Sequence, residues 1–178
     1  NSRGLACFDA NGDGIADLLW TNRDTVGDWV YIHYGGTNFS TAPNLKLQNP
    51  GVANFGNAIV NAGDMSGDGN IEIAVAASQA TITSGFVFIF EGGGRLNSQF
   101  DAAVGMSTDA DFGRSVSSVG DVTGDGLADI IVGAPHYAFG DDRGYWGVFK
   151  GDPRITEVKE KHSLPTVFNL YQSYPNPF

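Results

Sequence analysis

An all-β fold built from repeated small sheets is predicted by three features of this 178-residue sequence. An acidic, glycine-containing segment occurs three times, and an apolar run of strand-like residues follows each copy. The chain has 25 glycines without a collagen-like period, as expected for many tight turns. No stretch shows the 3.6-residue apolar period of an amphipathic helix. Short apolar runs separated by many turns are typical of all-β proteins.

The repeats begin at aspartates that are spaced almost evenly. The segments are DANGDGIADLLW from Asp9, DMSGDGNIEIAV from Asp64 and DVTGDGLADIIV from Asp121, so the spacings are 55 residues (9 to 64) and 57 residues (64 to 121). Periods near 50 residues are typical of the blades of a β-propeller. We therefore expect a partial β-propeller of three four-stranded blades. Because propellers usually need about 4–8 blades to close, we expect a fragment of a longer propeller.

Each blade is expected to contain the same strands in the same order. The apolar run after each loop is followed by a glycine-rich gap and a strand that ends in glycine, at residues 30–35, 86–92 and 145–151. Weaker fourth strands are expected near 44–47 and 96–100. A Phe-Gly pair stands nine residues before the aspartate in two repeats, at Phe55-Gly56 and Phe112-Gly113. The same offset from Asp9 falls before residue 1, so the first blade is expected to be truncated.

These patterns divide the chain into five predicted segments. They are a truncated first blade at 1–51, a second blade at 52–107, a third blade at 108–153, a polar linker at 154–163 and a proline-containing tail at 164–178.

The acidic loops carry oxygen-bearing residues at alternate positions, as a calcium ion requires. Ca²⁺ takes six to eight oxygen ligands at roughly 2.3–2.6 Å, and the loop glycines permit a tight turn. Three carboxylates in one loop repel one another without a cation. We expect up to three calcium ions, with ligands at positions 1, 3, 5, 7 (through the carbonyl) and 9: Asp9, Asn11, Asp13, Ile15 and Asp17; Asp64, Ser66, Asp68, Asn70 and Glu72; Asp121, Thr123, Asp125, Leu127 and Asp129.

The three loops are not equally strong candidates, and two other interpretations compete with a calcium site. The third loop is the strongest, and the second is weaker because Ser66 and Glu72 replace commoner ligands. An EF-hand needs a Glu at position 12 inside a helix, where this chain has Trp20, Val75 and Val132. A metal-free Asx turn is the other alternative. Three aligned copies, each with an acid at position 9, favour calcium over that turn.

Composition excludes several classes of function. The formal net charge is −10, from 20 acidic and 10 basic residues, so nucleic acid is not an expected partner. No stretch approaches the ~18 apolar residues of a membrane span. The lone Cys7 cannot form a disulfide within the chain. Neither an HExxH nor a GxSxG motif is present, so we expect a protein without catalytic activity.

The repeated motifs resemble the FG-GAP repeats of integrin alpha-subunit propellers and their bacterial relatives. The third copy matches best, with Phe112-Gly113, the acidic loop and Gly133-Ala134-Pro135, whereas the second has Ala76-Ala77-Ser78 in place of Gly-Ala-Pro. The resemblance implies calcium in the hairpin loops and binding of a protein or glycan on the opposite face. It thus implies a secreted or cell-surface module for recognition or adhesion. The alternative is an accessory propeller of a secreted enzyme, such as one that degrades polysaccharide.

The tail has a separate resemblance. LPTVFNLYQSYPNPF, at 164–178, is similar to the opening of the C-terminal sorting domain of type IX secretion. This implies that the type IX machinery exports the protein to the outer surface of a bacterium, in association with the outer membrane. The alternative is a proline-rich disordered tail.

Overall fold

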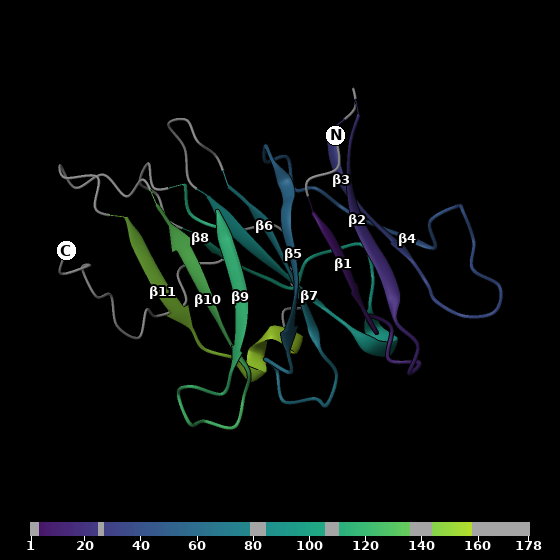
Figure 1. Ribbon diagram of the computed structural model, residues 1–178. Coiled ribbons are helices and arrows are strands. Elements are labelled where there is room, and N and C mark those ends of the chain that lie inside the picture. Colours follow the sequence, from purple (N-terminus) through teal and green to yellow (C-terminus); the bar gives the residue numbers. More distant parts are fainter. Residues whose placement is uncertain (1–3, 25–26, 79–84, 106–110, 136–143, 158–178) are drawn as a thin grey trace.

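The computed structural model describes residues 4–24, 27–78, 85–105, 111–135 and 144–157, and the strands in these ranges form three antiparallel sheets (Figure 1). The first sheet contains β1 (Leu5–Phe8), β2 (Asp17–Asp24), β3 (Gly27–His33) and β4 (Leu45–Leu47). The second contains β5 (Phe55–Gly63), β6 (Glu72–Ala77), β7 (Phe86–Glu91) and β8 (Ala102–Gly105). The third contains β9 (Ser115–Gly120), β10 (Asp129–Ala134) and β11 (Tyr145–Phe149). The all-β partial propeller is therefore confirmed, with three strands in the described part of the third sheet.

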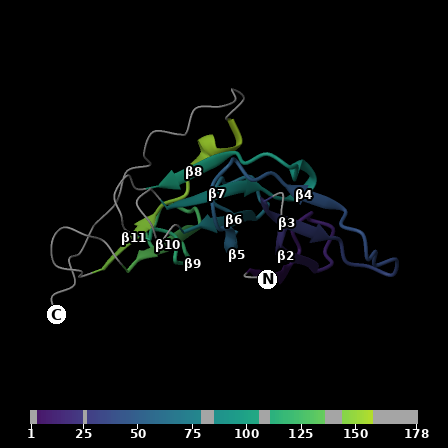
Figure 2. The same ribbon diagram turned by 90° about the horizontal axis from the view of Figure 1, so that it is seen from above.

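The three sheets stand side by side like neighbouring blades. Seen from above, they fan out around β5 and β9, while β4, β8 and β11 lie farther from that centre (Figure 2). Strand β5 of the middle sheet contacts both β1 and β9, so the first strands of the three repeats are neighbours. Within the described part of the chain, no helix has the length and apolar character needed to cross a membrane.

The first and second sheets pack through a core of aliphatic residues against aromatic ones. The first sheet contributes Leu19, Val30 and Ile32, and all three side chains are fully buried. The second contributes Phe88 and Phe90 with their neighbours on the same face. Fully burying a side chain of this kind stabilises the fold by roughly 1.5–3 kcal/mol. This interface explains the alternating phenylalanines of the 86–92 segment.

The second and third sheets pack through a core in which small residues meet large ones. The second sheet presents Ala74 and Ala76, and the third presents Phe112 and Phe149, whose rings meet edge to face at 5.6 Å. The middle sheet is thus covered on both faces, and every residue of β6 is buried. An unbroken apolar run is the sequence pattern expected of such a strand.

The Phe-Gly pairs attach each sheet to the one before it. Gly56 and Gly113 both have left-handed backbones, with φ of 81° and 83°. A Cβ on Gly56 would stand 2.6 Å from Thr21 Oγ1, and one on Gly113 would stand 3.0 Å from the Phe86 carbonyl oxygen. Only glycine combines this conformation with so close an approach. The motif therefore serves packing between sheets.

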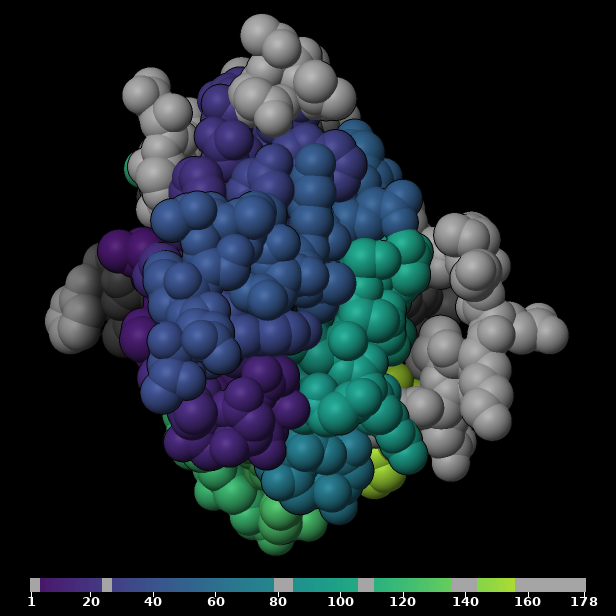
Figure 3. Space-filling model, turned by 90° about the vertical axis from the view of Figure 1, so that its right-hand side faces the viewer, coloured from purple at the N-terminus to yellow at the C-terminus, as the bar shows by residue number. Residues whose placement is uncertain are grey.

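One predicted strand was wrong. In the second sheet the fourth strand is β8, Ala102–Gly105, and not the segment 96–100. A short 3₁₀ helix, η1 (Gly93–Arg95), follows β7, and Phe100 then packs edge to face on Phe88 at 5.1 Å. The segment 96–100 lies against the first sheet, where the Gln48 N–H donates to the Ser98 carbonyl at 2.7 Å (Figure 3, blue beside teal). The expectation near 44–47 was correct, because β4 lies there.

The chain after the third sheet continues as a second 3₁₀ helix, η2 (Pro153–Glu157). Ile155 is buried in the core between the second and third sheets. The start of the predicted linker at 154 therefore packs against the blades. The sorting tail predicted at 164–178 lies outside the described residues.

Candidate metal centre

The three acidic loops occupy equivalent places in the fold. They connect β1 to β2, β5 to β6 and β9 to β10, along the same edge of the molecule (Figure 1, lower edge). Position 9 of each loop is the first residue of the next strand: Asp17, Glu72 and Asp129. Position 12 therefore lies in a strand in every repeat. The loops join strand to strand, as predicted, and none leads into the helix of an EF-hand.

The first aspartate of each loop holds the turn together through backbone hydrogen bonds. Asp64 accepts the N–H groups of Gly67 at 2.6 Å, Asp68 at 3.2 Å and Gly69 at 2.9 Å. Asp9 and Asp121 accept from the same three positions of their own loops. Aspartate favours such turns because its short side chain reaches the backbone a few residues ahead. The Asx geometry that the metal-free alternative requires is therefore present in all three loops.

Position 9 is an aspartate in the first and third loops, and there both carboxylate oxygens accept hydrogen bonds. Asp129 Oδ2 accepts the N–H groups of Val122 at 2.9 Å and Thr123 at 3.0 Å, and Oδ1 accepts that of Gly151 at 3.2 Å. Asp17 accepts the equivalent three donors of the first loop. Both aspartates are fully buried. They hold the loop to the end of the third strand of the same sheet.

The second loop has Glu72 at position 9, and its hydrogen bonding is incomplete. Glu72 Oε2 accepts the Met65 N–H at 2.5 Å, but Oε1 has no hydrogen-bond partner although the side chain is fully buried. The Ser66 hydroxyl, at position 3, is also buried; it lies beside the Glu72 carboxylate and partly opposes the rise in pKa that burial causes there, but it makes no hydrogen bond of full geometry. Buried polar atoms nearly always have a partner, so two such oxygens in one loop indicate a missing ligand.

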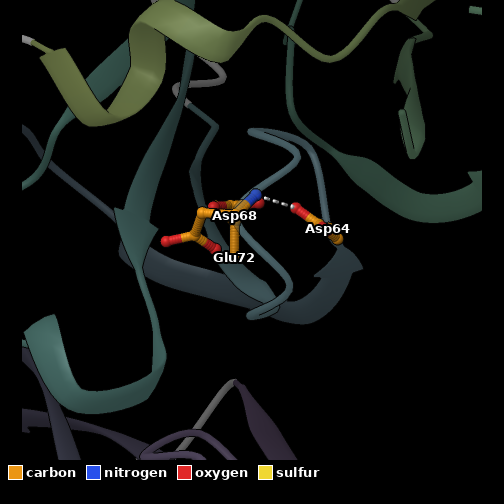
Figure 4. A group of neighbouring side chains, drawn as sticks. All are labelled: Asp64, Asp68 and Glu72. Carbon is orange, nitrogen blue, oxygen red and sulfur yellow. Dashed lines mark hydrogen bonds between the residues drawn. The ribbon is translucent and has the colours of Figure 1, made fainter. Parts of the chain in front are cut away.

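The carboxylates of the second loop converge. One ligand oxygen from each of Asp64, Asp68 and Glu72 lies within 4.8 Å of the others (Figure 4). Among the residues that the structure describes, no other group of three His, Cys, Asp or Glu side chains meets at this distance. Of the predicted site residues, the structure thus brings together the three carboxylates of the second loop. The acids of the first and third loops do not converge as closely.

Burial and the neighbouring acids make Glu72 costly to ionise. Burial raises the pKa of Glu72 to about 7, and the charges of Asp64 and Asp68 add to the rise. For Asp68, burial acts in the same upward direction, but hydrogen bonds from Asn70 and the charge of Arg95 bring its pKa below the usual value. A divalent cation among the three carboxylates would favour their ionised forms. The electrostatics thus match a cation-binding loop.

The donor set fits a hard cation. The second loop offers carboxylate oxygens, the Ser66 hydroxyl and the Asn70 carbonyl, without nitrogen or sulfur ligands. Oxygen-only sets of this kind suit Ca²⁺ or Mg²⁺, and a set with imidazole or thiolate ligands suits zinc.

Backbone contacts tie the first and second loops to the repeat that follows each of them. The Gly93 N–H donates to the Ala10 carbonyl at 2.9 Å, and the Asp152 N–H donates to the Met65 carbonyl at 2.8 Å. Ala10 and Met65 both occupy position 2 and are buried, whereas Val122 at position 2 of the third loop is 57% exposed. The third repeat therefore covers the second loop, where Ser66 is buried, whereas Thr123 at the same position of the third loop is exposed.

Sequence reasoning missed one set of residues beside the loops. Tyr34, Glu91 and Lys150 each precede a glycine that packs on the loop backbone: Gly35, Gly92 and Gly151. The sequence signal was available, because these residues stand directly before the glycine that ends the strand in each repeat.

Comparisons with known proteins agree with this architecture. The profile of the FG-GAP repeat matches residues 112–145, and that of the FG-GAP-like repeat matches residues 9–75. The chain is 34% identical over 150 residues to integrin alpha-4 of Xenopus laevis, which covers 73% of this chain and 14% of that protein. It is 31% identical over 183 residues to integrin alpha-5 of Xenopus laevis, covering 93% of this chain and 17% of that protein. The aligned part therefore spans less than a fifth of the length of either integrin chain.

Proposed function

Because the chain carries FG-GAP repeats and is similar to integrin alpha chains, we propose that it is a calcium-stabilised propeller module. It recognises a protein or carbohydrate outside the cell and does not catalyse a reaction. Both the secreted or cell-surface location and the adhesive role come from the family resemblance.

The observation that carries the calcium proposal is the second loop. One oxygen from each of three carboxylates lies within 4.8 Å of the others, and both Oε1 of Glu72, one of the three, and the neighbouring Ser66 hydroxyl are buried without a hydrogen bond of full geometry. A calcium ion supplies the positive charge that this oxygen set needs. Asp64 and Asp68 hold it from the turn, and Glu72 holds it from the start of β6. The ion would thus fix the hairpin between β5 and β6.

The first and third loops have the same ligand pattern and are proposed as two further calcium sites. Their carboxylates already accept backbone hydrogen bonds, but a carboxylate oxygen can accept more than one partner. Calcium binding in these loops would draw Asp13 and Asp125, at position 5, toward the first aspartate of the loop. We expect all three ions to stiffen the loop edge and leave the opposite edge for a ligand.

Calcium binding is tested by calorimetric titration of protein from which a chelator has removed calcium, called the chelated protein below. We expect heat of binding and a higher melting temperature in calcium than in chelator. Asp68→Asn should reduce both effects, because it removes a carboxylate from the strongest site. Asp28→Asn is a matched control, since Asp28 pairs with Arg23 in β2 and β3, outside the acidic loops. An unchanged melting temperature with no binding heat would refute the proposal.

The recognition role is tested by measuring binding to immobilised glycans and extracellular proteins with calcium and with chelator. We expect at least one ligand whose binding is lost in chelator and weakened by Asp68→Asn. Calcium-independent binding to every surface would indicate non-specific adsorption and contradict the proposal.

Export by type IX secretion is proposed from the tail at 164–178 alone. Deleting these residues from the full-length protein should abolish its delivery to the surface of a bacterium that has the system. Normal delivery of the deletion variant would contradict this part.

A further inference from the structure

We propose that the residue before the strand-ending glycine sets the relative calcium affinities of the three loops, with Glu91 strengthening the second and Lys150 weakening the third. This inference rests on the proposed calcium function and goes beyond it, because it assigns a role to residues outside the predicted ligand set. It also predicts an order of filling: the second loop first and the third last.

The three residues stand in equivalent places. Tyr34, Glu91 and Lys150 precede Gly35, Gly92 and Gly151, each of which packs against the position 8 carbonyl of its own loop, leaving no room for a Cβ. This packing presses the end of the third strand onto the loop. The preceding side chain is therefore held beside the acids of that loop in every repeat, while its chemistry changes from phenol to carboxylate to ammonium.

In the third loop, this residue competes with a cation. Lys150 Nζ lies 3.5 Å from Asp125 Oδ2, the carboxylate at position 5. A calcium ion that uses Asp125 would have to displace this ammonium group or bind in spite of its repulsion. The side chains of Lys150 and Asp125 are 41% and 29% exposed, so solvent screens the repulsion only in part.

In the second loop, this residue adds negative charge. Glu91 is directly opposite Glu72 in the β6–β7 pairing, and its carboxyl lies within hydrogen-bonding reach of Asp68. The Glu91 N–H donates to Asp101 Oδ2 at 2.7 Å, which brings a further acid close. Arg95 Nη1 contacts Glu91 Oε1 at 2.9 Å, and its charge also acts on Asp68, so Arg95 offsets part of this negative charge. Like charges directly opposite in a sheet are destabilising, and a bound cation would relieve that repulsion.

The first loop provides an internal reference. Tyr34 brings no charge to the loop while its phenol is protonated, and burial followed by the charge of Asp17 raises its pKa above the usual value. Its loop keeps three acids, Asp9, Asp13 and Asp17, with the same backbone hydrogen bonds as the third loop. The first loop also differs from the third in its contact with Gly93 and in the Asn11–Asp13 hydrogen bonds, so the effect of Lys150 is measured from Lys150 variants, with the first loop as the unaltered signal.

The test follows each loop separately by NMR during a calcium titration of the chelated chain. The amide groups of Gly14, Gly69 and Gly126 are suitable probes, because each donates to the first aspartate of its own loop at 2.7–2.9 Å. Lys150→Glu should lower the calcium midpoint of Gly126 by about tenfold and leave Gly14 unchanged. Lys150→Gln should give a smaller shift in the same direction. Glu91→Lys should raise the midpoint of Gly69 by about tenfold.

Lys46→Glu is the matched control, because it makes the same change in net charge on β4, where Lys46 lies over the Trp29 ring. A shift of Gly126 as large in this control as in Lys150→Glu would overturn the proposal, since net charge alone would explain it. Unchanged midpoints in the Lys150 variants would overturn it as well and leave the calcium proposal intact. If calcium moves none of the three glycine signals in the wild type, both proposals fail.

Discussion

The second and third loops share a sequence pattern, yet they meet their polar requirements in different ways. In the third, Asp129 uses both oxygens to accept backbone N–H groups, and the loop is satisfied without an ion. In the second, the longer Glu72 accepts only the Met65 N–H and leaves Oε1 buried without a partner. Glu72 is one methylene longer than Asp129. Asp129 therefore binds backbone N–H groups with both oxygens, whereas Glu72 keeps one oxygen available for a metal ion.

Burial accounts for the rest of the difference. The third repeat covers the second loop through the Met65 and Asp152 contact, and Ser66 is buried there, whereas Thr123 at the same position of the third loop is exposed. The second loop has the less typical ligands by sequence, yet a bound cation would stabilise its buried carboxylates more than those of the third loop.

The largest expected effect comes from exchanging the acid at position 9 for its amide. Asp129→Asn should destabilise the chelated protein by roughly 2–4 kcal/mol, because an amide NH₂ must then face a backbone N–H donor. Glu72→Gln should leave the chelated protein at least as stable as the wild type at neutral pH, since Oε2 can still be replaced by an accepting oxygen and no buried charge remains. Urea unfolding in chelator measures both. Equal losses would contradict the contrast between the two loops.

The pH dependence of the chelated protein should be the next largest effect. Because burial raises the pKa of Glu72 from an ordinary value of 4.5 to about 7, the folded state binds this proton more tightly than the unfolded state. The stabilisation is thus complete below pH 4.5 and is lost as the pH rises through 7. We expect the wild type to lose about 2–3 kcal/mol more than Glu72→Gln over this range. Parallel stability curves for the two proteins would rule this out.

Calcium should stabilise the protein mainly through the second loop. At a calcium concentration about tenfold above the dissociation constant, binding contributes about 1.4 kcal/mol per site. Asp68→Asn should remove this gain at low calcium, whereas Asp125→Asn should remove less, because Lys150 already opposes binding there. Thermal melting across a calcium series compares the variants. A greater loss of calcium-dependent stabilisation with Asp125→Asn than with Asp68→Asn would contradict the expected order of calcium affinity.

The smallest effect is expected at position 3. Ser66→Ala should change the stability of the chelated protein by no more than about 1 kcal/mol, because the buried hydroxyl makes no hydrogen bond of full geometry and lies only beside the Glu72 carboxylate. The same change should weaken calcium binding at Gly69 a few-fold. Thr123→Ala, at an exposed position, is the control for stability in chelator. A clear loss of stability in chelated Ser66→Ala would show that the hydroxyl has a structural partner.

Much of the architecture could be predicted because it depends on local pattern. The spacing of Asp9, Asp64 and Asp121 gave the three sheets, and the apolar position 12 gave strand exits from the loops. The fourth strand of the second sheet could not be placed, because Phe100 is apolar for packing on Phe88 and not for pairing in the sheet. The expected order of calcium affinity among the loops depends on the contact between Met65 and Asp152, which are far apart in sequence. The motif within a single repeat cannot reveal this contact, because it joins two different repeats.

The contacts that join one loop to the next sheet use backbone atoms on both sides. Ala10 and Met65 supply the equivalent carbonyls, and Gly93 and Asp152 supply the equivalent N–H groups. Because no side chain takes part, the residues at these places differ between repeats without loss of the bond. A duplicated or exchanged repeat would therefore keep this joint without matching substitutions, and only the side-chain cores between the sheets would have to adapt. This joint suits a lineage that grows and diversifies by copying whole repeats.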